Sequence, residues 1–274
     1  MTQNILIIGL KPINSGKTSL AQAVISYLKK HQCKAVGFKP FSGSNIWYDF
    51  DMIDTTLSQS RIFSKDVMVL KQEAGVDIDE EELNPIHRIW NEPAIIDPIT
   101  SLPSFILDRI TLSTKSKKQY LLVINQNNVS QLNKKYFENL FKKPYEKQFI
   151  SDVNTLNELT NTYYQKAICD SYQKIKKIFD VVVVESYADN ALLPWNGLDH
   201  FDVVLAITPG FIFSYNPIQY EKALQVSKQM YSWEVSTSKI AEMIKPIKKI
   251  SLHPTTSHNV LPYLKSKIPK LFEL

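Results

Sequence analysis

Short apolar runs and longer stretches with helical spacing alternate along this 274-residue chain. A short run that is apolar on both faces, such as the four valines that precede Glu185, is typical of a strand buried in a parallel sheet. We expect strands at residues 4–9, 35–38, 181–185, 203–207 and 247–252.

Apolar residues three and four positions apart predict amphipathic helices between these strands. In the first helix, Leu20, Ala23, Val24 and Leu28 share one face. The strand, helix and strand from residue 4 to residue 38 make one βαβ unit, and such units build right-handed parallel sheets. The pattern therefore predicts an α/β fold with a doubly wound, mostly parallel sheet. The expected helices cover residues 17–30, 52–60, 156–179, 217–230 and 260–266.

The middle of the chain departs from this regular order. Residues 104–112 and 119–125 look like two strands joined by a polar loop, which predicts a hairpin. Residues 131–145 are rich in Lys, Asn and aromatic side chains, which indicates a helix or a surface excursion. Because no internal repeat and no clear linker divides the sequence, we interpret residues 1–274 as a single domain with an insertion around residues 104–150.

The composition is that of an ordinary globular protein. Hydrophobic residues make up 44% of the chain and charged residues 22%. No segment reaches the roughly 18 consecutive apolar residues that a membrane-spanning helix needs. The apolar run at residues 5–8 is too short for the core of a signal peptide. We expect a cytoplasmic protein that does not enter a membrane.

The net charge of +5 permits an anionic partner. The basic residues are scattered, however, and nearly all are lysines, with arginine only at Arg61, Arg88 and Arg109. A groove for nucleic acid usually interleaves Arg and aromatic side chains on one face. The sequence therefore argues against nucleic acid as the partner.

The clearest chemical signal follows the first expected strand. A polyphosphate needs several backbone N–H donors, a helix N-terminus and a cation, and a turn ending in Gly-Lys-Thr at a helix start supplies all three. Gly16 would let the backbone approach the phosphates, Lys17 would reach the β- and γ-phosphates, and Thr18 would hold Mg²⁺. The usual pattern has another glycine at the position of Lys11, whereas the nearest glycine here is Gly9. The expected nucleotide-binding residues are Asn14, Ser15, Gly16, Lys17, Thr18 and Ser19.

Three further segments accompany this loop. They are Gly37-Phe38-Lys39-Pro40, the acidic group Asp49, Asp51 and Asp54, and Glu185. Together with the loop they resemble the dethiobiotin synthetase-like family of P-loop ATPases, which implies a sheet of the P-loop NTPase type. The family has a Lys-Pro, a Mg²⁺-binding Asp and a Val-Glu-Gly segment at corresponding places. Here Glu185 continues into the polar residues 186–190 instead of a Gly-rich loop. The chain therefore resembles a P-loop ATPase or GTPase relative of that family more than the synthetase itself.

Each of these residues also has a physical interpretation. Lys39, at the carboxyl end of the second strand, would meet the γ-phosphate and neutralise charge during its transfer. Mg²⁺ prefers hard oxygen ligands, which Thr18, Asp51 and Glu185 would provide. We prefer Asp51 within the acidic group, although acidic residues at a helix start also stabilise the helix dipole. A carboxylate after four valines is costly to bury unless it binds a metal, acts as a base or reaches the strand tip. We therefore expect Lys17, Lys39 and Glu185 as catalytic residues, with ATP and Mg²⁺ as cofactors.

Two classes of function stay open at this point. The first is an ATPase, ligase or phosphotransferase that acts on a small molecule in a pocket lined by Ser42, Gly43 and residues 186–190. The second is a nucleotide-dependent switch in which residues 104–145 contact a protein partner. GTP is an alternative to ATP, but the nearest match to a guanine-binding motif, at residues 133–136, lacks its Asp. A homodimer also stays open.

Overall fold

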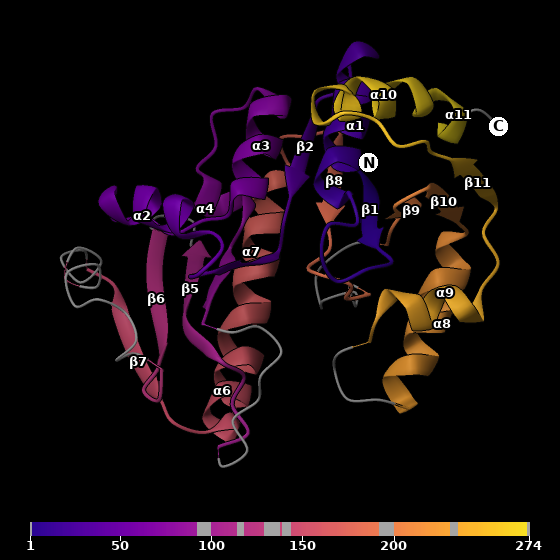
Figure 1. Cartoon of the computed structure of the whole chain (residues 1–274). Coiled ribbons are helices and arrows are strands. Elements are labelled where there is room, and N and C mark those ends of the chain that lie inside the picture. Colours follow the sequence, from indigo (N-terminus) through magenta and orange to yellow (C-terminus); the bar gives the residue numbers. More distant parts are fainter. Residues whose placement is uncertain are drawn as a thin grey trace. The chain divides into compact units, whose positions relative to one another are not determined.

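A computed structural model describes residues 2–91, 100–113, 118–128, 138, 144–191, 200–230 and 235–272 (Figure 1). The chain divides into two compact units. Unit 1 consists of Met1–Lys39, Met68–Asp77 and Gln173–Leu274, and unit 2 consists of Pro40–Val67 and Ile78–Tyr172. Both units contain a sheet and helices, so the predicted α/β class is confirmed. The predicted insertion falls inside unit 2, and most of residues 131–145 lie outside the described residues.

Unit 1 contains a six-stranded sheet in the order β11-β10-β9-β1-β8-β2. Strands β9, β1, β8 and β2 are parallel, whereas β10 and β11 are antiparallel additions at one edge. All the strands predicted from apolar runs occur in this sheet, and the unpredicted β10 follows β9 through a turn at Pro209 and Gly210. The sheet is mixed, so the doubly wound parallel arrangement stays a prediction. The strands are β1 Gln3–Gly9, β2 Ala35–Phe38, β8 Val181–Glu185, β9 Val203–Thr208, β10 Phe211–Tyr215 and β11 Lys248–Ser251.

Helix α1 (Lys17–Lys30) lies against the four parallel strands and packs beside α10 (Val260–Lys267), as Figure 1 shows. Its predicted apolar face is buried, with Leu20, Ala23 and Val24 fully covered. Among the described residues, no helix is both long and apolar enough to cross a membrane. Further helices that lie wholly or partly in unit 1 are α3 Lys65–Ala74, α7 Gln165–Ile175, α8 Pro217–Met230, α9 Thr237–Met243 and α11 Pro269–Phe272, with a 3₁₀ turn at Ser257–Asn259.

Unit 2 contains a five-stranded mixed sheet in the order β3-β4-β5-β6-β7. Strands β5 and β6 are antiparallel neighbours, which confirms the predicted hairpin. The hairpin lies in the middle of this sheet, and all nine residues of β5 are buried. It is therefore part of the core of unit 2. The strands are β3 Phe41–Asn45, β4 Ile86–Trp90, β5 Phe105–Ser113, β6 Lys118–Asn125 and β7 Glu146–Ile150.

Three consecutive helical segments form one long helix that begins in unit 2. Helix α6 (Val153–Leu159) continues through a π-helical segment, Thr160–Tyr164, into α7. The helix predicted over residues 156–179 therefore begins three residues earlier and ends four residues earlier than predicted. Helices α2 (Phe50–Ser58) and α4 (Glu80–Leu83) are further helices among the described residues of unit 2.

Two of the three arginines are buried inside unit 2. The guanidinium of Arg88 donates two hydrogen bonds of 2.7 Å to the two carboxylate oxygens of Asp108. The Tyr164 hydroxyl donates to the same carboxylate. Arg109 is fully buried and donates to the backbone carbonyl groups of Ile62 and Pro85. These arginines therefore satisfy buried acceptors.

Candidate functional site

The end of β1, the loop after it and the start of α1 form a tight backbone cradle. Asn14 and Gly16 have left-handed backbones, with φ of 55° and 98°, and Gly16 is the residue that caps α1. A Cβ atom on Gly9 would lie 2.4 Å from Ser15 Oγ and 2.8 Å from Lys17 Nζ, which is closer than real Cβ contacts allow. The absence of a side chain at Gly9 thus allows Ser15 and Lys17 to approach the end of β1 closely, whereas Lys11 is exposed.

The cradle contains a buried cationic side chain. Lys17 is only 9% exposed, and its ammonium group donates to Ser15 Oγ at 3.2 Å. Within this described segment, the first turn of α1 contains no acidic residue, and no side chain caps the helix. The N–H groups of the first turn and the positive end of the helix dipole both favour an anion at such a position. Ser15 is buried, Ser19 is half-buried and Asn14 is exposed, so the predicted loop residues surround the helix start.

Strand register brings two distant residues to the same edge. In the parallel pairing, Glu185 lies opposite Ile7 of β1, and Val184 lies opposite Phe38 of β2. Lys39 follows Phe38, so its side chain starts beside Glu185. The Lys39 ammonium donates to Glu185 Oε1 at 2.5 Å, and the two side chains are only 4% and 1% exposed.

Thr18 joins this pair from the start of α1. Its Oγ1 donates to the same Glu185 Oε1 at 3.0 Å. The predicted residues Lys17, Thr18, Lys39 and Glu185 therefore all lie within unit 1, at the carboxyl ends of β1, β2 and β8. Ligands of open α/β sheets bind at this edge.

The residues present suit a phosphate-bound divalent cation. A hydroxyl and a carboxylate oxygen lie 3.0 Å apart at Thr18 and Glu185, and both are the hard oxygen ligands that Mg²⁺ prefers. Among the described residues, no group of three or more His, Cys, Asp or Glu side chains could hold a metal by itself. Mg²⁺ is commonly bound by one or two protein oxygens together with phosphate oxygens and water. The site fits that mode of binding.

Two of the predicted residues lie in unit 2. Asp51 is exposed in the first turn of α2, and its role as a metal ligand stays a prediction. Ser42, expected to line a substrate pocket, is fully buried within β3. Its hydroxyl donates to Asn84 Oδ1 at 2.7 Å and lies 2.6 Å from His87 Nδ1. Ser42 is therefore part of a buried polar network of unit 2.

Sequence reasoning missed Thr237, at the start of α9. Its hydroxyl is fully buried and donates to the carbonyl oxygen of Gly9. The Thr237 N–H donates to the carbonyl of Asp189 at 2.6 Å, and Asn190 forms a bridge with Ser236. Thr237 thus ties the base of the cradle to the loop that follows Glu185. The only sequence signal was a Ser/Thr-rich stretch, which is typical of many surface loops.

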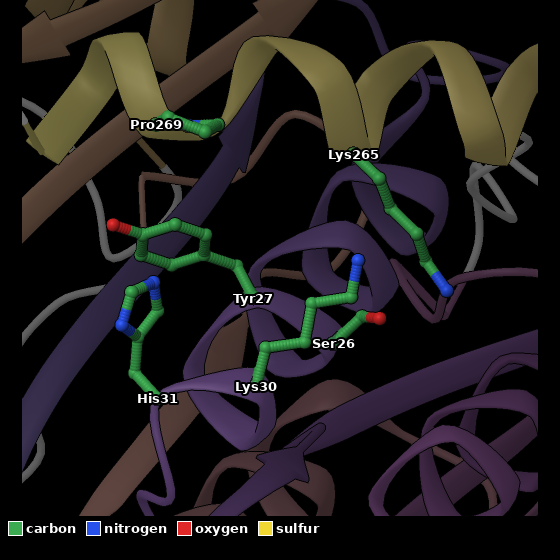
Figure 2. A pocket seen from close by; sticks show the side chains of 6 residues that line it. All are labelled: Ser26, Tyr27, Lys30, His31, Lys265 and Pro269. Atoms are coloured by element: carbon green, nitrogen blue, oxygen red, sulfur yellow. The ribbon is translucent and has the colours of Figure 1, made fainter.

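A surface pocket lies at the opposite end of α1 (Figure 2). Its volume is about 240 Å³, and Lys265 on its rim forms an ion pair of 3.1 Å with Glu73. Lys30 and His31 lie at the carboxyl end of α1, where cations stabilise the helix dipole. Because its lining residues on α1 lie nine or more residues after Lys17, this pocket is about 14 Å or more along the helix from the cradle and is separate from it. The lining residues are Ser26, Tyr27, Lys30, His31, Lys265 and Pro269.

Comparison with known proteins adds no assignment. No family model matches the chain, and no curated protein matches its sequence. The inferences about function below therefore rest on the geometry and chemistry of unit 1.

Proposed function

We propose that this chain is a Mg²⁺-dependent ATP-binding protein of the P-loop NTPase type, which hydrolyses ATP or transfers its γ-phosphoryl group to a small molecule. One observation carries the proposal. A helix N-terminus with a backbone cradle, two buried lysines and a hydroxyl–carboxylate pair converge at the carboxyl edge of the unit 1 sheet. Cradle, cations and metal ligands are the parts that phosphoryl transfer needs.

Each residue has a role in this proposal. The N–H groups at the start of α1 bind the phosphate chain, and Lys17 balances its charge. Thr18 and Glu185 hold Mg²⁺, which when bound neutralises charge on the β- and γ-phosphate oxygens. Lys39 stabilises the negative charge that develops on the transferred group. Asp51 is a candidate for a further metal ligand.

The alternative is a nucleotide-dependent switch. That hypothesis assigned residues 104–145 to a protein partner, but within this segment β5 and β6 form the centre of the unit 2 sheet. A buried hairpin offers little surface to a partner, so this observation favours the enzyme. ATP remains preferred over GTP, because the residue 133–136 segment lacks the guanine-binding Asp. That segment lies outside the described residues.

A thermal-shift panel tests the proposal. ATP, ADP, GTP and GDP are compared with and without Mg²⁺ on the wild type, on Lys17→Ala and on Lys30→Ala. Lys30 is exposed on the same helix and is the matched control. A ligand present at 100 times its dissociation constant adds about 2.7 kcal/mol to the free energy of unfolding. We expect ATP with Mg²⁺ to raise the melting temperature of the wild type and of Lys30→Ala. We expect a smaller rise in Lys17→Ala.

Two results would contradict the proposal. No shift with any nucleotide at millimolar concentration would refute nucleotide binding. An ATP shift that Lys17→Ala leaves unchanged would refute the assigned site.

A further inference from the structure

We propose that Glu185 exchanges partners on ligand binding: it holds Lys39 as long as no divalent cation is bound, and it gives up Lys39 when a divalent cation binds. Lys39 then turns to the terminal phosphate. This inference rests on the proposed function, because it concerns the same site. It makes Lys39 a residue that couples metal binding to nucleotide binding.

The first step is that two donors share one carboxylate oxygen. The Lys39 ammonium and the Thr18 hydroxyl both donate to Glu185 Oε1, at 2.5 and 3.0 Å. A Mg²⁺ ion held by Thr18 and Glu185 would sit about 2.0–2.1 Å from each ligand oxygen. It would therefore take the place around Oε1 that the two donors now occupy.

The second step is electrostatic. Lys39 and Glu185 are both buried, so little water screens their charges. A dication and an ammonium group on one carboxylate oxygen would repel each other strongly in this environment. Binding of the cation through Oε1 therefore favours movement of Lys39 away from that oxygen.

The third step concerns where Lys39 can go. An ammonium group that stays buried without an anion is costly. Lys39 and the cradle lie at the same sheet edge. The terminal phosphate of a nucleotide bound in the cradle would therefore be the anion that Lys39 contacts. Metal and nucleotide should therefore assist each other's binding, and the coupling must be reciprocal.

Two titrations separate this exchange from a fixed structural role for Lys39. The first measures Mn²⁺ binding by electron paramagnetic resonance with no nucleotide present. The second measures binding of a non-hydrolysable ATP analogue in EDTA. Because neither mixture contains both ligands, chelation of the metal by the nucleotide cannot affect either measured affinity.

We expect Lys39→Met to change the two affinities in opposite directions. Mn²⁺ should bind about tenfold or more tightly, because the ion no longer displaces an ammonium group from Glu185. The metal-free analogue should bind more weakly, because without Lys39 the buried charge of Glu185 is no longer neutralised and repels the phosphates at the same sheet edge. Lys34→Met is the matched control, since Lys34 is exposed just before the opposite end of β2, and it should leave both affinities unchanged. If Lys39→Met does not fold, Lys39→Gln removes the charge and keeps a donor for Glu185.

The outcomes distinguish the two proposals. Unchanged or weaker Mn²⁺ binding by a folded Lys39 variant overturns the exchange, even if the wild type binds nucleotide normally. A wild type that binds no nucleotide under any condition overturns the proposed function, and the exchange with it.

Discussion

Replacing Gly9 with alanine would test whether the cradle is shaped for a ligand. The added methyl group would lie 2.4 Å from Ser15 Oγ and 2.8 Å from Lys17 Nζ. Both are side-chain atoms, so the hydroxyl can rotate and the lysine chain can bend away. Gly9 is not among the residues with positive φ, so the backbone of β1 can accept alanine. The change should therefore act on the loop more than on the fold.

The size of the expected loss of affinity follows from the steric overlap of the added methyl group with Ser15 and Lys17. One extra methyl group in a well-packed region costs about 1–3 kcal/mol. We expect most of this cost when Ser15 and Lys17 must take up their ligand-bound positions. Because about 1.4 kcal/mol corresponds to a factor of ten in a dissociation constant, the affinity for ATP should fall about 5- to 150-fold.

Isothermal titration calorimetry with ATP and Mg²⁺ measures this loss, and thermal melting reports the stability of the variant. Gly210→Ala is a matched control, because Gly210 has φ of +93° and a Cβ there would meet nothing within 4 Å. This control should lose about 1–2 kcal/mol of stability from the left-handed backbone and keep the wild-type affinity. Wild-type affinity in Gly9→Ala would refute the cradle as the binding site. Equal loss of affinity in both variants would point to general destabilisation.

Three further predictions concern other parts of the chain. Asp108→Asn leaves the buried Arg88 without its counter-charge, so we expect urea denaturation to show a loss of about 3–5 kcal/mol in the free energy of unfolding. Thr237→Val removes the donor to the carbonyl at the end of β1, and an unsatisfied buried carbonyl should lower stability by about 1–3 kcal/mol in the same assay. Hydrogen bonds from the first turn of α6 lower the pKa of Asp152. Its stabilising effect is therefore present above the ordinary carboxyl pKa near 4 and is lost as pH falls through the lowered value. Melting curves of Asp152→Asn, which keeps a helix-capping side chain, should show a weaker dependence on pH below about 4 than the wild type.

The regular elements of unit 1 were predictable from the sequence because their signals are local. Ala35–Phe38, Val181–Glu185 and the helices Lys17–Lys30 and Pro217–Met230 occur with the predicted bounds. Each combines an apolar pattern with a polar or proline boundary, so propensity and burial indicate the same element.

Unit 2 was harder to predict, because its strands depend on partners far away in the sequence. Strand β3 has the sequence Phe-Ser-Gly-Ser-Asn, which has little intrinsic preference for a strand, and it forms by pairing with β4. Strand β4 contains His87 and Arg88 at buried positions, where they contact Ser42 and Asp108 from other strands. These polar residues made the strand hard to recognise, because a single sequence does not show which partners will form hydrogen bonds with them.

The site was predicted as a set of residues at one sheet edge, but the contacts among them depend on strand register. The four valines of β8 are buried on both faces, so hydrophobicity alone would tolerate a slip of one residue. A slip would turn Glu185 to the other face and break its contacts with Thr18 and Lys39. The polar residues at the two ends of β8 oppose this. Asp180 accepts the Lys34 N–H at 2.9 Å at one end, and Glu185 accepts from Lys39 and Thr18 at the other. The contacts of Glu185 therefore have two effects, since they bring Thr18 and Lys39 to one carboxylate and also hold the central strand in register.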